Sequence, residues 1–181
     1  MLALQPLGSV LPADRPYEAL TRFYAQAGDV ARARVLLAAA DSNNRALDRI
    51  MTAEMAWARG EIALATGDLR GAETELREAS RDHWCPICVL PSLGRAYDMG
   101  GKPDLALATY REYLSTPWLL RYESDAIEAG RILRRMGELY ERAGQRDQSQ
   151  RAWNDLLTLW RNAEGAAALE VREVEKLLGT R

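Results

Sequence analysis

A glycine expected at a turn between two helices recurs along this chain, and its periodicity constrains the fold more than any single residue does. The recurring glycines are Gly28, Gly67, Gly101 and Gly144, spaced by 39, 34 and 43 residues. Each is followed five residues later by an alanine or a serine, and four residues after that by a large apolar residue. Self-similarity with a period of this size indicates a helical repeat protein.

The second and third copies of the pattern align without an insertion at a shift of 34 residues. Extra residues therefore fall between copies, after Ala40 and after Leu114. The matching positions are Gly60, Gly67, Ala72 and Leu76 in the second copy, and Gly94, Gly101, Ala106 and Tyr110 in the third.

This pattern resembles the tetratricopeptide repeat (TPR), a unit of about 34 residues that folds into two antiparallel helices. The second copy departs from the family pattern at Arg59 and Ala63, and the first has Thr21 in place of a small residue. The resemblance implies an all-α fold, a right-handed superhelix of antiparallel helix pairs with about four repeats. The best match is Leu93-Gly94-x-x-Tyr97 with Ala106, Tyr110 and Pro117 in the third copy.

The repeats are expected at about 14–47, 53–86, 87–120 and 130–163, within a single domain that covers residues 1–181. The segment 164–178 places Val171, Val174 and Leu178 at helical spacing, which predicts a capping helix over the last repeat. Composition agrees with an all-helical chain, because alanine, leucine, arginine and glutamate dominate and runs of valine, isoleucine and threonine are missing. Carboxylates are expected in or next to helix first turns at Asp29, Asp68 and Asp147.

The 24 basic and 26 acidic residues give a formal charge of -2, so no global field attracts the chain to nucleic acid or to an acidic membrane. No apolar run approaches the roughly 20 residues of a membrane span. The segment from Met1 to Pro12 lacks a basic region and a long apolar region, so no secretory signal is predicted and a cytoplasmic location is expected.

The segment His83-Trp84-Cys85-Pro86-Ile87-Cys88 combines the only histidine with both cysteines. Pro86 favours the first turn of a new helix, with Cys85 as its cap. Three interpretations remain open: a reversible disulfide, three of the four ligands of a zinc site, or two cysteines that pack as small apolar residues at a repeat junction. The first two would make His83, Cys85 and Cys88 a redox- or metal-responsive module.

Patterns typical of catalytic sites are missing from the sequence. One histidine cannot form a metal-binding pair, and neither a Gly-x-Ser-x-Gly elbow nor a phosphate-binding glycine-rich loop followed by lysine and serine occurs. We therefore expect a chain that is not an enzyme and needs no cofactor or metal.

Binding is the remaining class of function. In TPR proteins the first helix of each pair lines a concave groove, and the resemblance implies that a protein or a peptide is the partner. Lysine and asparagine, with which one branch of the family grips the carboxyl-terminal tail of chaperones, are absent from these positions. Trp57 is the candidate anchor, or else a core residue. The implied groove residues are Glu18, Arg22, Trp57, Glu61, Arg95, Asp98, Met99, Arg134, Glu138 and Arg142.

The insertion from Ser115 to Gly130 contains Trp118, Leu119, Leu120 and Tyr122, which makes it too apolar for a free loop. It is expected to fold onto neighbouring helices or, if exposed, to form a homodimer contact. A self-associating structural unit is therefore an alternative to the binding scaffold.

A second resemblance concerns the last two repeats. The runs Cys85-Pro86-Ile87-Cys88 and Leu157-Thr158-Leu159-Trp160-Arg161-Asn162-Ala163 look like the carboxyl-terminal repeat region of bacterial signalling chains that carry a serine/threonine kinase or a DNA-binding regulatory domain. This resemblance implies a docking segment in bacterial signalling or regulation.

Overall fold

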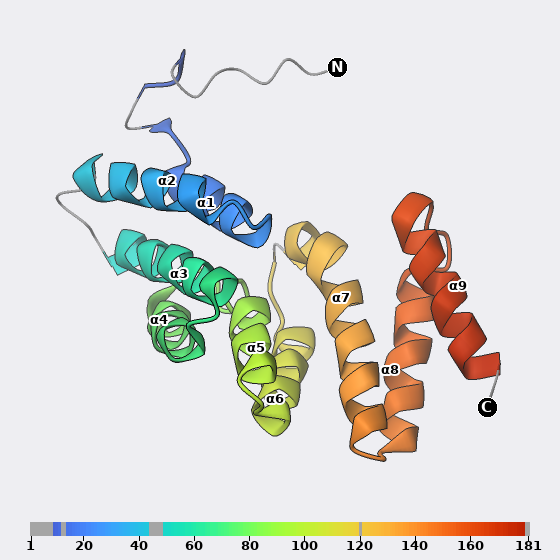
Figure 1. The fold of residues 1–181 in the computed structure, drawn as a ribbon. Helices are drawn as coiled ribbons and strands as arrows, with labels where there is room; N and C mark the ends of the chain where they lie inside the picture. Colours follow the sequence, from blue (N-terminus) through green and yellow to red (C-terminus); the bar gives the residue numbers. More distant parts are fainter. Residues whose placement is uncertain (1–8, 12–13, 44–48, 120, 180–181) are drawn as a thin grey trace. The chain divides into compact units, whose positions relative to one another are not determined.

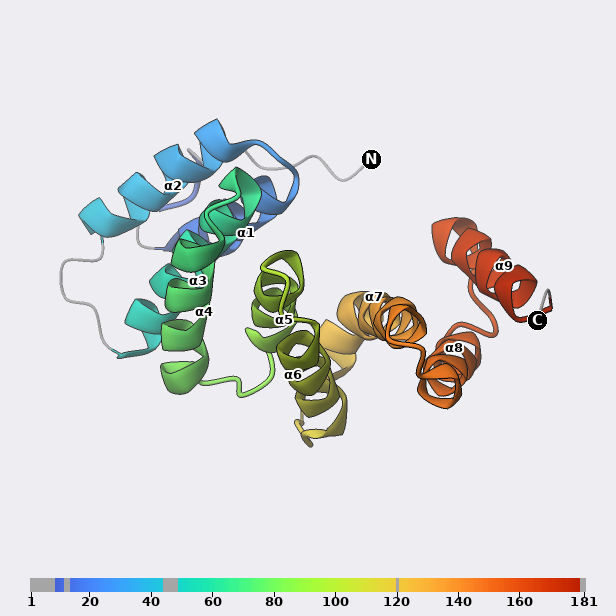
Figure 2. The same ribbon diagram turned by 60° about the horizontal axis from the view of Figure 1, so that its bottom comes forward.

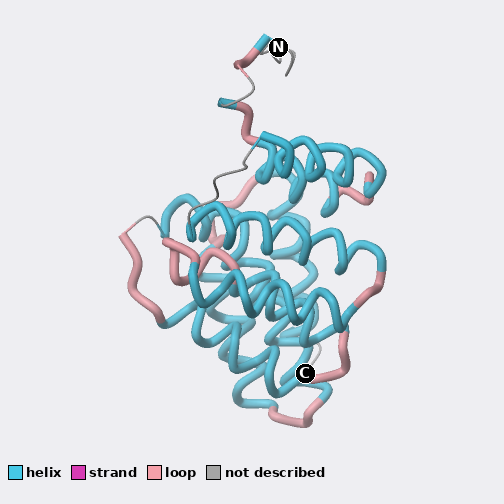
Figure 3. The backbone as a smooth tube through the Cα atoms, turned by 90° about the vertical axis from the view of Figure 1, so that its left-hand side faces the viewer, coloured by secondary structure: helices cyan, strands magenta, loops and turns pink. Residues whose placement is uncertain are grey.

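The computed structural model describes residues 9–11, 14–43, 49–119 and 121–179, and all regular structure in these ranges is helical (Figure 3). The expected all-α fold is therefore confirmed. The helices of this part of the chain are α1 (Tyr17–Gln26), α2 (Val30–Asn43), α3 (Arg49–Thr66), α4 (Leu69–Asp82), α5 (Leu90–Met99), α6 (Pro103–Ser115), α7 (Arg121–Arg142), α8 (Arg146–Leu159) and α9 (Gly165–Gly179).

The four recurring glycines lie between the two helices of each pair, as the periodicity predicts. Gly28, Gly67, Gly101 and Gly144 have φ values of +82°, +76°, +70° and +71°. This left-handed backbone conformation suits glycine because any Cβ atom would be strained there. The expected carboxylates follow these turns: Asp29 accepts the backbone N–H of Arg32 at 3.1 Å, Asp68 accepts that of Gly71 at 3.0 Å, and Asp147 lies in the first turn of α8.

Small residues let the two helices of a pair approach closely. A Cβ atom added to Gly60 on α3 would lie 2.6 Å from the side chain of Leu76 on α4. A Cβ atom added to Gly137 on α7 would lie equally close to the indole of Trp153 on α8. Thr21 is tolerated at the equivalent place on α1 because it is fully buried and donates a hydrogen bond to the carbonyl of Tyr17 at 2.7 Å.

The chain forms two compact units, Met1–Lys102 and Pro103–Arg181, named unit 1 and unit 2 below. In unit 1, α3 lies between α1 and α5 and also packs against α2 and α4 (Figure 1). Tyr17, Leu36, Ala40 and Met55 form one buried apolar cluster of this unit. The first helices of three successive pairs, α1, α3 and α5, thus lie next to one another.

In unit 2, α7, α8 and α9 follow one another in space (Figure 2). Leu133, Trp153, Leu156 and Val174 form the buried cluster that joins these three helices. The amphipathic helix expected at 164–178 is α9, and it covers α8 as a cap. The single domain and the repeat boundaries expected from the sequence stay a prediction.

The helix that follows the two cysteines starts later than the sequence predicts. The helix expected to start at Pro86 with Cys85 as its cap is wrong: residues 83–89 form a turn, and α5 starts at Leu90 with Pro91 in its first turn. A proline can begin a helix because it lacks the N–H that would remain unpaired there, and both Pro86 and Pro91 satisfy that rule.

The insertion of 115–130 is mostly the first part of α7, a helix of 22 residues. Arg121 ties its start to the end of α6 by donating to the carbonyls of Tyr113 at 2.7 Å and Thr116 at 2.9 Å. Leu119 remains 89% exposed, and Leu120 lies outside the described residues. A dimer contact through this segment stays a prediction. Across the described ranges, no helix is long and apolar enough to cross a membrane.

Candidate functional site

The structure distributes the predicted groove residues over both units. Three of them, Arg134, Glu138 and Arg142, lie on α7 in unit 2. The other seven lie in unit 1 on α1, α3 and α5, namely Glu18, Arg22, Trp57, Glu61, Arg95, Asp98 and Met99. Three of these seven, Glu61, Arg95 and Met99, line one hollow of the surface.

Glu61 is a deeply buried charge of unit 1, with 2% of its surface exposed. Arg95 donates from Nη2 to both carboxylate oxygens at 2.8 Å, and the hydroxyl of Ser92 donates to the same carboxylate. A carboxylate in such a place is tolerated only when it is paired and hydrogen-bonded. Arg95 is itself 41% exposed at its side chain, and its buried Nε–H has no partner in the described part of the chain.

Trp57 lies at the edge of the core. Its ring is half-buried, and Nε1 donates to the hydroxyl of Ser92 at 3.1 Å. The guanidinium of Arg22 lies over the ring, 4.0 Å from its centroid, in a cation–π contact. Trp57 is therefore a fixed indole at the edge of the core that is neither fully buried nor free to move.

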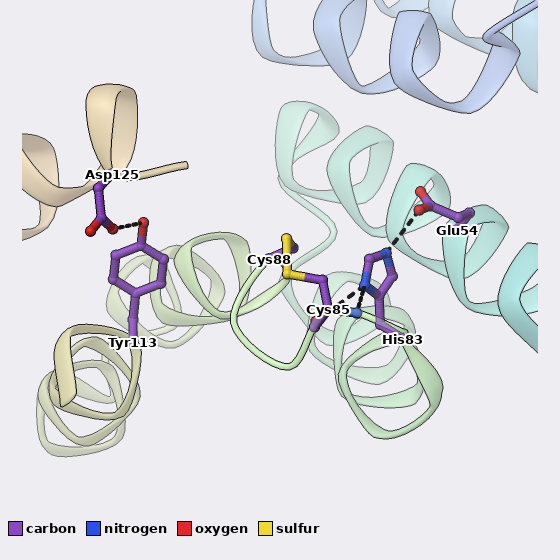
Figure 4. Close-up of a disulfide and its surroundings, with 6 residues drawn as sticks. All are labelled: Glu54, His83, Cys85, Cys88, Tyr113 and Asp125. Atoms are coloured by element: carbon purple, nitrogen blue, oxygen red, sulfur yellow. Dashed lines mark hydrogen bonds and ion pairs between the residues drawn. A yellow bond between two sulfur atoms is a disulfide. The ribbon is translucent and has the colours of Figure 1, made fainter. Parts of the chain in front are cut away.

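A second ion pair extends this network toward the turn at 83–89. Arg22 contacts Glu54 with 2.5 Å between Nη1 and Oε2, and the other oxygen of Glu54 lies 2.9 Å from Nε2 of His83 (Figure 4). The backbone N–H of Cys85 lies 3.0 Å from Nδ1 of His83. Nδ1 also lies 3.2 Å from the carbonyl oxygen of Cys85. Because an ionised carboxylate can only accept, Nε2 donates to Glu54.

This pairing shifts the ionisation of Glu54. Burial acts to raise the pKa of its carboxyl, but the hydrogen bond from His83 and the charge of Arg22 outweigh burial and lower the pKa from 4.5 to about 2. Glu54 therefore stays ionised and keeps its two partners in place over the whole neutral range.

A hollow of about 160 Å³ opens beside this network. Arg95 and Met99 of α5 line it together with residues of α1 and α3, and Met99 is 55% exposed. The hollow has apolar walls and two charged groups, which suits the insertion of one side chain of a partner. Its lining residues are Ala25, Gln26, Glu61, Leu64, Ala65, Arg95 and Met99.

Sequence reasoning missed Glu54, Ser92 and the part that His83 plays in this network. A signal for the first two existed, because Glu54, Trp57 and Glu61 are spaced by three and four residues and so share one face of α3. Ser92 precedes Arg95 by three residues on α5 in the same way. No spacing rule connects the turn residue His83 with α3, so only the structure shows that contact.

One predicted groove residue of unit 2, Arg134, joins two helices. Arg134 of α7 contacts two carboxylates of α9, Glu170 at 3.3 Å and Glu173 at 3.0 Å, and also Glu138 of its own helix at 3.4 Å. Burial acts to lower the pKa of Arg134, but these carboxylates outweigh burial and raise the pKa above its ordinary value. Arg134 thus fastens the capping helix to α7.

The two cysteines form a disulfide between Cys85 and Cys88, with 5.5 Å between their Cα atoms (Figure 4). Cys85 is also buried, as the interpretation of two cysteines packing as small apolar residues expects, and the bond adds a covalent link between them. The residues that the structure describes contain no group of three histidine, cysteine, aspartate or glutamate side chains that could hold a metal ion.

Figure 4 also shows a separate contact of unit 2, in which Tyr113 donates to Asp125 at 2.7 Å.

Comparison with known proteins identifies the fold. A solved structure described as nearly identical TPR-like repeats of a kinesin light chain from Podosopora anserina superimposes with a TM-score of 0.63. The match covers 94% of this chain and 89% of that one at 14% identity. This chain has a TPR-like fold. No protein-family model matches the sequence, and no curated protein is significantly similar to it. TPR-like repeats are generally scaffolds for protein interaction. At 14% identity, the similarity to the solved structure shows the fold alone.

Proposed function

We propose that this chain is a scaffold that binds a protein or a peptide through the surface that α1, α3 and α5 form in unit 1. The observation that carries the proposal is the hollow between these helices, bordered by Arg95 and Met99, with the indole of Trp57 held nearby through Ser92, which donates to Glu61 of the hollow's lining. Aromatic and arginine side chains next to a small pocket are the usual centres of binding energy at protein interfaces.

The polar network supports this proposal because it holds the surface ready for a partner. Glu61 fixes Arg95 and is only 2% exposed at its side chain, and Glu54 fixes Arg22, with both side chains of that pair less than one fifth exposed. Side chains that are already ordered lose little conformational entropy on binding. Such a surface recognises a partner without chemical change, in agreement with a chain that is not an enzyme and uses no cofactor.

The finer proposal is a role in bacterial signalling or regulation, in the cytoplasm, with a protein or peptide as partner and without nucleic acid or membrane contact. It is supported by the resemblance around Cys85-Pro86-Ile87-Cys88 and by the formal charge of -2. The exposed Leu119 makes a homodimer the second partner to consider.

A pull-down from a bacterial lysate tests the binding surface. The chain is compared with a Trp57→Ala, Arg95→Ala double variant, and captured proteins are quantified by mass spectrometry. The matched control is an Arg34→Ala, Val35→Ala double variant, because both residues are exposed on α2, a second helix of its pair. Helix content and thermal unfolding are measured for all three proteins, since removing Arg95 leaves the Glu61 carboxylate buried without its ion pair.

We expect proteins that bind the chain and the α2 variant but are reduced at least tenfold with the groove variant. Each such protein is then purified and its affinity measured by calorimetry. Partners that bind all three proteins equally well would place the interaction elsewhere on the chain. If light scattering shows a dimer and no other protein is captured, self-association is the better description.

A further inference from the structure

The disulfide lies at the edge of the proposed binding surface and is unevenly accessible. Cys85 is 1% exposed, whereas Cys88 is half-buried. The four-residue ring that the disulfide closes also contains Ile87, which is fully buried and fixes the turn against unit 1. An incoming thiolate therefore meets the sulfur of Cys88 and is kept from that of Cys85.

We propose that the Cys85–Cys88 disulfide is a thiol–disulfide exchange site for a dithiol reductant, and that its opening releases His83 from Glu54 and frees the Arg22–Trp57 end of the binding surface. The exchange reaction is independent of any binding partner. The consequence for the surface rests on the function proposed above.

The exchange step involves only the disulfide and the dithiol. A thiolate of the reductant attacks Sγ of Cys88, the bond between the two cysteine sulfurs breaks, and Sγ of Cys85 leaves as a thiolate that takes up a proton. The second thiol of the reductant then attacks the mixed disulfide and releases Cys88 as a thiol. Two electrons and two protons pass to the chain, and the reductant is left as a disulfide.

The coupling follows a continuous set of contacts away from the sulfurs (Figure 4). The disulfide holds the backbone of Cys85, whose N–H lies 3.0 Å from Nδ1 of His83. Nε2 of His83 lies 2.9 Å from Glu54. Glu54 holds Arg22, which in turn covers the ring of Trp57 at 4.0 Å. Opening the ring lets Cys85 rotate, so the hydrogen bond that orients His83 is lost first.

The chain is proposed to act in the cytoplasm, where a disulfide of this kind would be a redox sensor. In a reducing cytoplasm thiols are kept reduced, and the disulfides that do form there are mostly transient and catalytic or redox-sensing. The Cys85–Cys88 pair would then respond to the redox state of the cytoplasm. The binding surface would be ordered when the disulfide is closed.

The first measurement locates the attacked sulfur. The folded chain is treated with reduced glutathione, the mixed disulfide is trapped by acid, and the modified cysteine is identified by peptide mass spectrometry. We expect glutathione on Cys88 in at least tenfold excess over Cys85, and full reduction by dithiothreitol with the helix content unchanged. Equal labelling, a disulfide that opens only when the chain unfolds, or two thiols that oxidised glutathione cannot join would each overturn the proposal.

The second measurement follows the coupling without any partner. Carbon NMR gives the pKa of the Glu54 carboxyl in the oxidised chain, in the chain reduced with dithiothreitol, and in a Cys85→Ser, Cys88→Ser variant. We expect the pKa to rise by at least one unit on reduction, and the variant to match the reduced chain whether or not dithiothreitol is present. Backbone amide signals of α8 in unit 2 serve as the control and should not move.

An unchanged Glu54 pKa after complete reduction would overturn the coupling, whatever the pull-down shows. The opposite combination is a Glu54 pKa that shifts on reduction together with captured proteins that bind the groove variant as well as the parent chain. That result would support the exchange site and contradict the proposed function. The two hypotheses therefore fail separately. For a groove partner found in the pull-down, we expect at least a threefold difference in Kd between the oxidised and reduced chain.

Discussion

The two units differ in the side-chain contacts that join their helices. In unit 1, ion pairs with buried or half-buried carboxylates connect α1, α3 and α5, and Glu61 and Glu54 are only 2% and 18% exposed at their side chains. In unit 2, an aromatic side chain fills the space over a glycine, as with Trp153 and Gly137. Arg134 also pairs there with Glu170 and Glu173, whose side chains are 36% and 62% exposed and thus more exposed than Glu61 and Glu54.

We infer from this difference that the contacts of unit 2 serve mainly stability and those of unit 1 mainly recognition. The buried cluster of unit 2 is apolar, and its packing depends little on pH. The network of unit 1 costs desolvation energy, yet it presents oriented guanidinium groups and an indole next to a hollow. We therefore expect unit 2 to respond mainly to changes of volume and unit 1 mainly to changes of charge.

The largest effect is expected from Trp153→Ala in unit 2. Truncating a buried tryptophan costs about 3–5 kcal/mol, and we expect a value near the lower end because the buried Nε1 of Trp153 has no partner among the described residues. Urea titrations followed by amide NMR signals of α8 and α3 report the two units separately. Leu119→Ala is the control, since that side chain is 89% exposed and should change the free energy of unfolding by less than about 0.5 kcal/mol.

A loss in α3 as large as the loss in α8 would show that the two units unfold together. In that case the two units would differ in their contacts but would share one free energy of unfolding.

The second prediction concerns acid and unit 1. The pKa of Glu54 is lower in the folded chain, about 2 against an ordinary 4.5, so its contribution is present above pH 4.5 and is lost as the pH falls toward 2. The shift corresponds to about 3 kcal/mol. Urea titrations from pH 7 to pH 2 should show this loss in the α3 signals, and a Glu54→Gln variant should show a flatter profile.

An acid profile of Glu54→Gln that parallels that of the parent chain would mean that other carboxylates carry the pH dependence of unit 1. The α8 signals provide the reference in the same samples, because the buried cluster of unit 2 contains only apolar residues.

Local sequence rules predicted much of this fold. Gly28, Gly67, Gly101 and Gly144 identified the turns because their backbone conformation is a property of the residue itself. The capping helix α9 followed from the spacing of Val171, Val174 and Leu178, which depends on one helix alone. The start of α5 was wrong because Pro86 and Pro91 both satisfy the same local rule, and the disulfide turn decides between them.

The candidate site was predicted only in part. Trp57, Glu61 and Arg95 follow from repeat positions, but their partners Glu54 and Ser92 depend on which face of each helix meets its neighbour. His83 reaches Glu54 from a turn 29 residues away in sequence. Periodicity within a repeat carries no information about such contacts, which arise from packing between pairs.

The smallest effect is expected from Arg134→Met, which tests whether the ion pairs of unit 2 resemble those of unit 1. Arg134 contacts Glu170 and Glu173 where solvent reaches both partners, so the loss should be less than about 1 kcal/mol in the α9 signals and should vanish in 1 M salt. Methionine keeps the apolar stem that packs between α7 and α9, so only the charge is removed. A loss of 2 kcal/mol or more that survives high salt would mean that Arg134 acts as a buried charge. The capping helix would then be held in the same way as the binding surface, by an ion pair with little access to solvent.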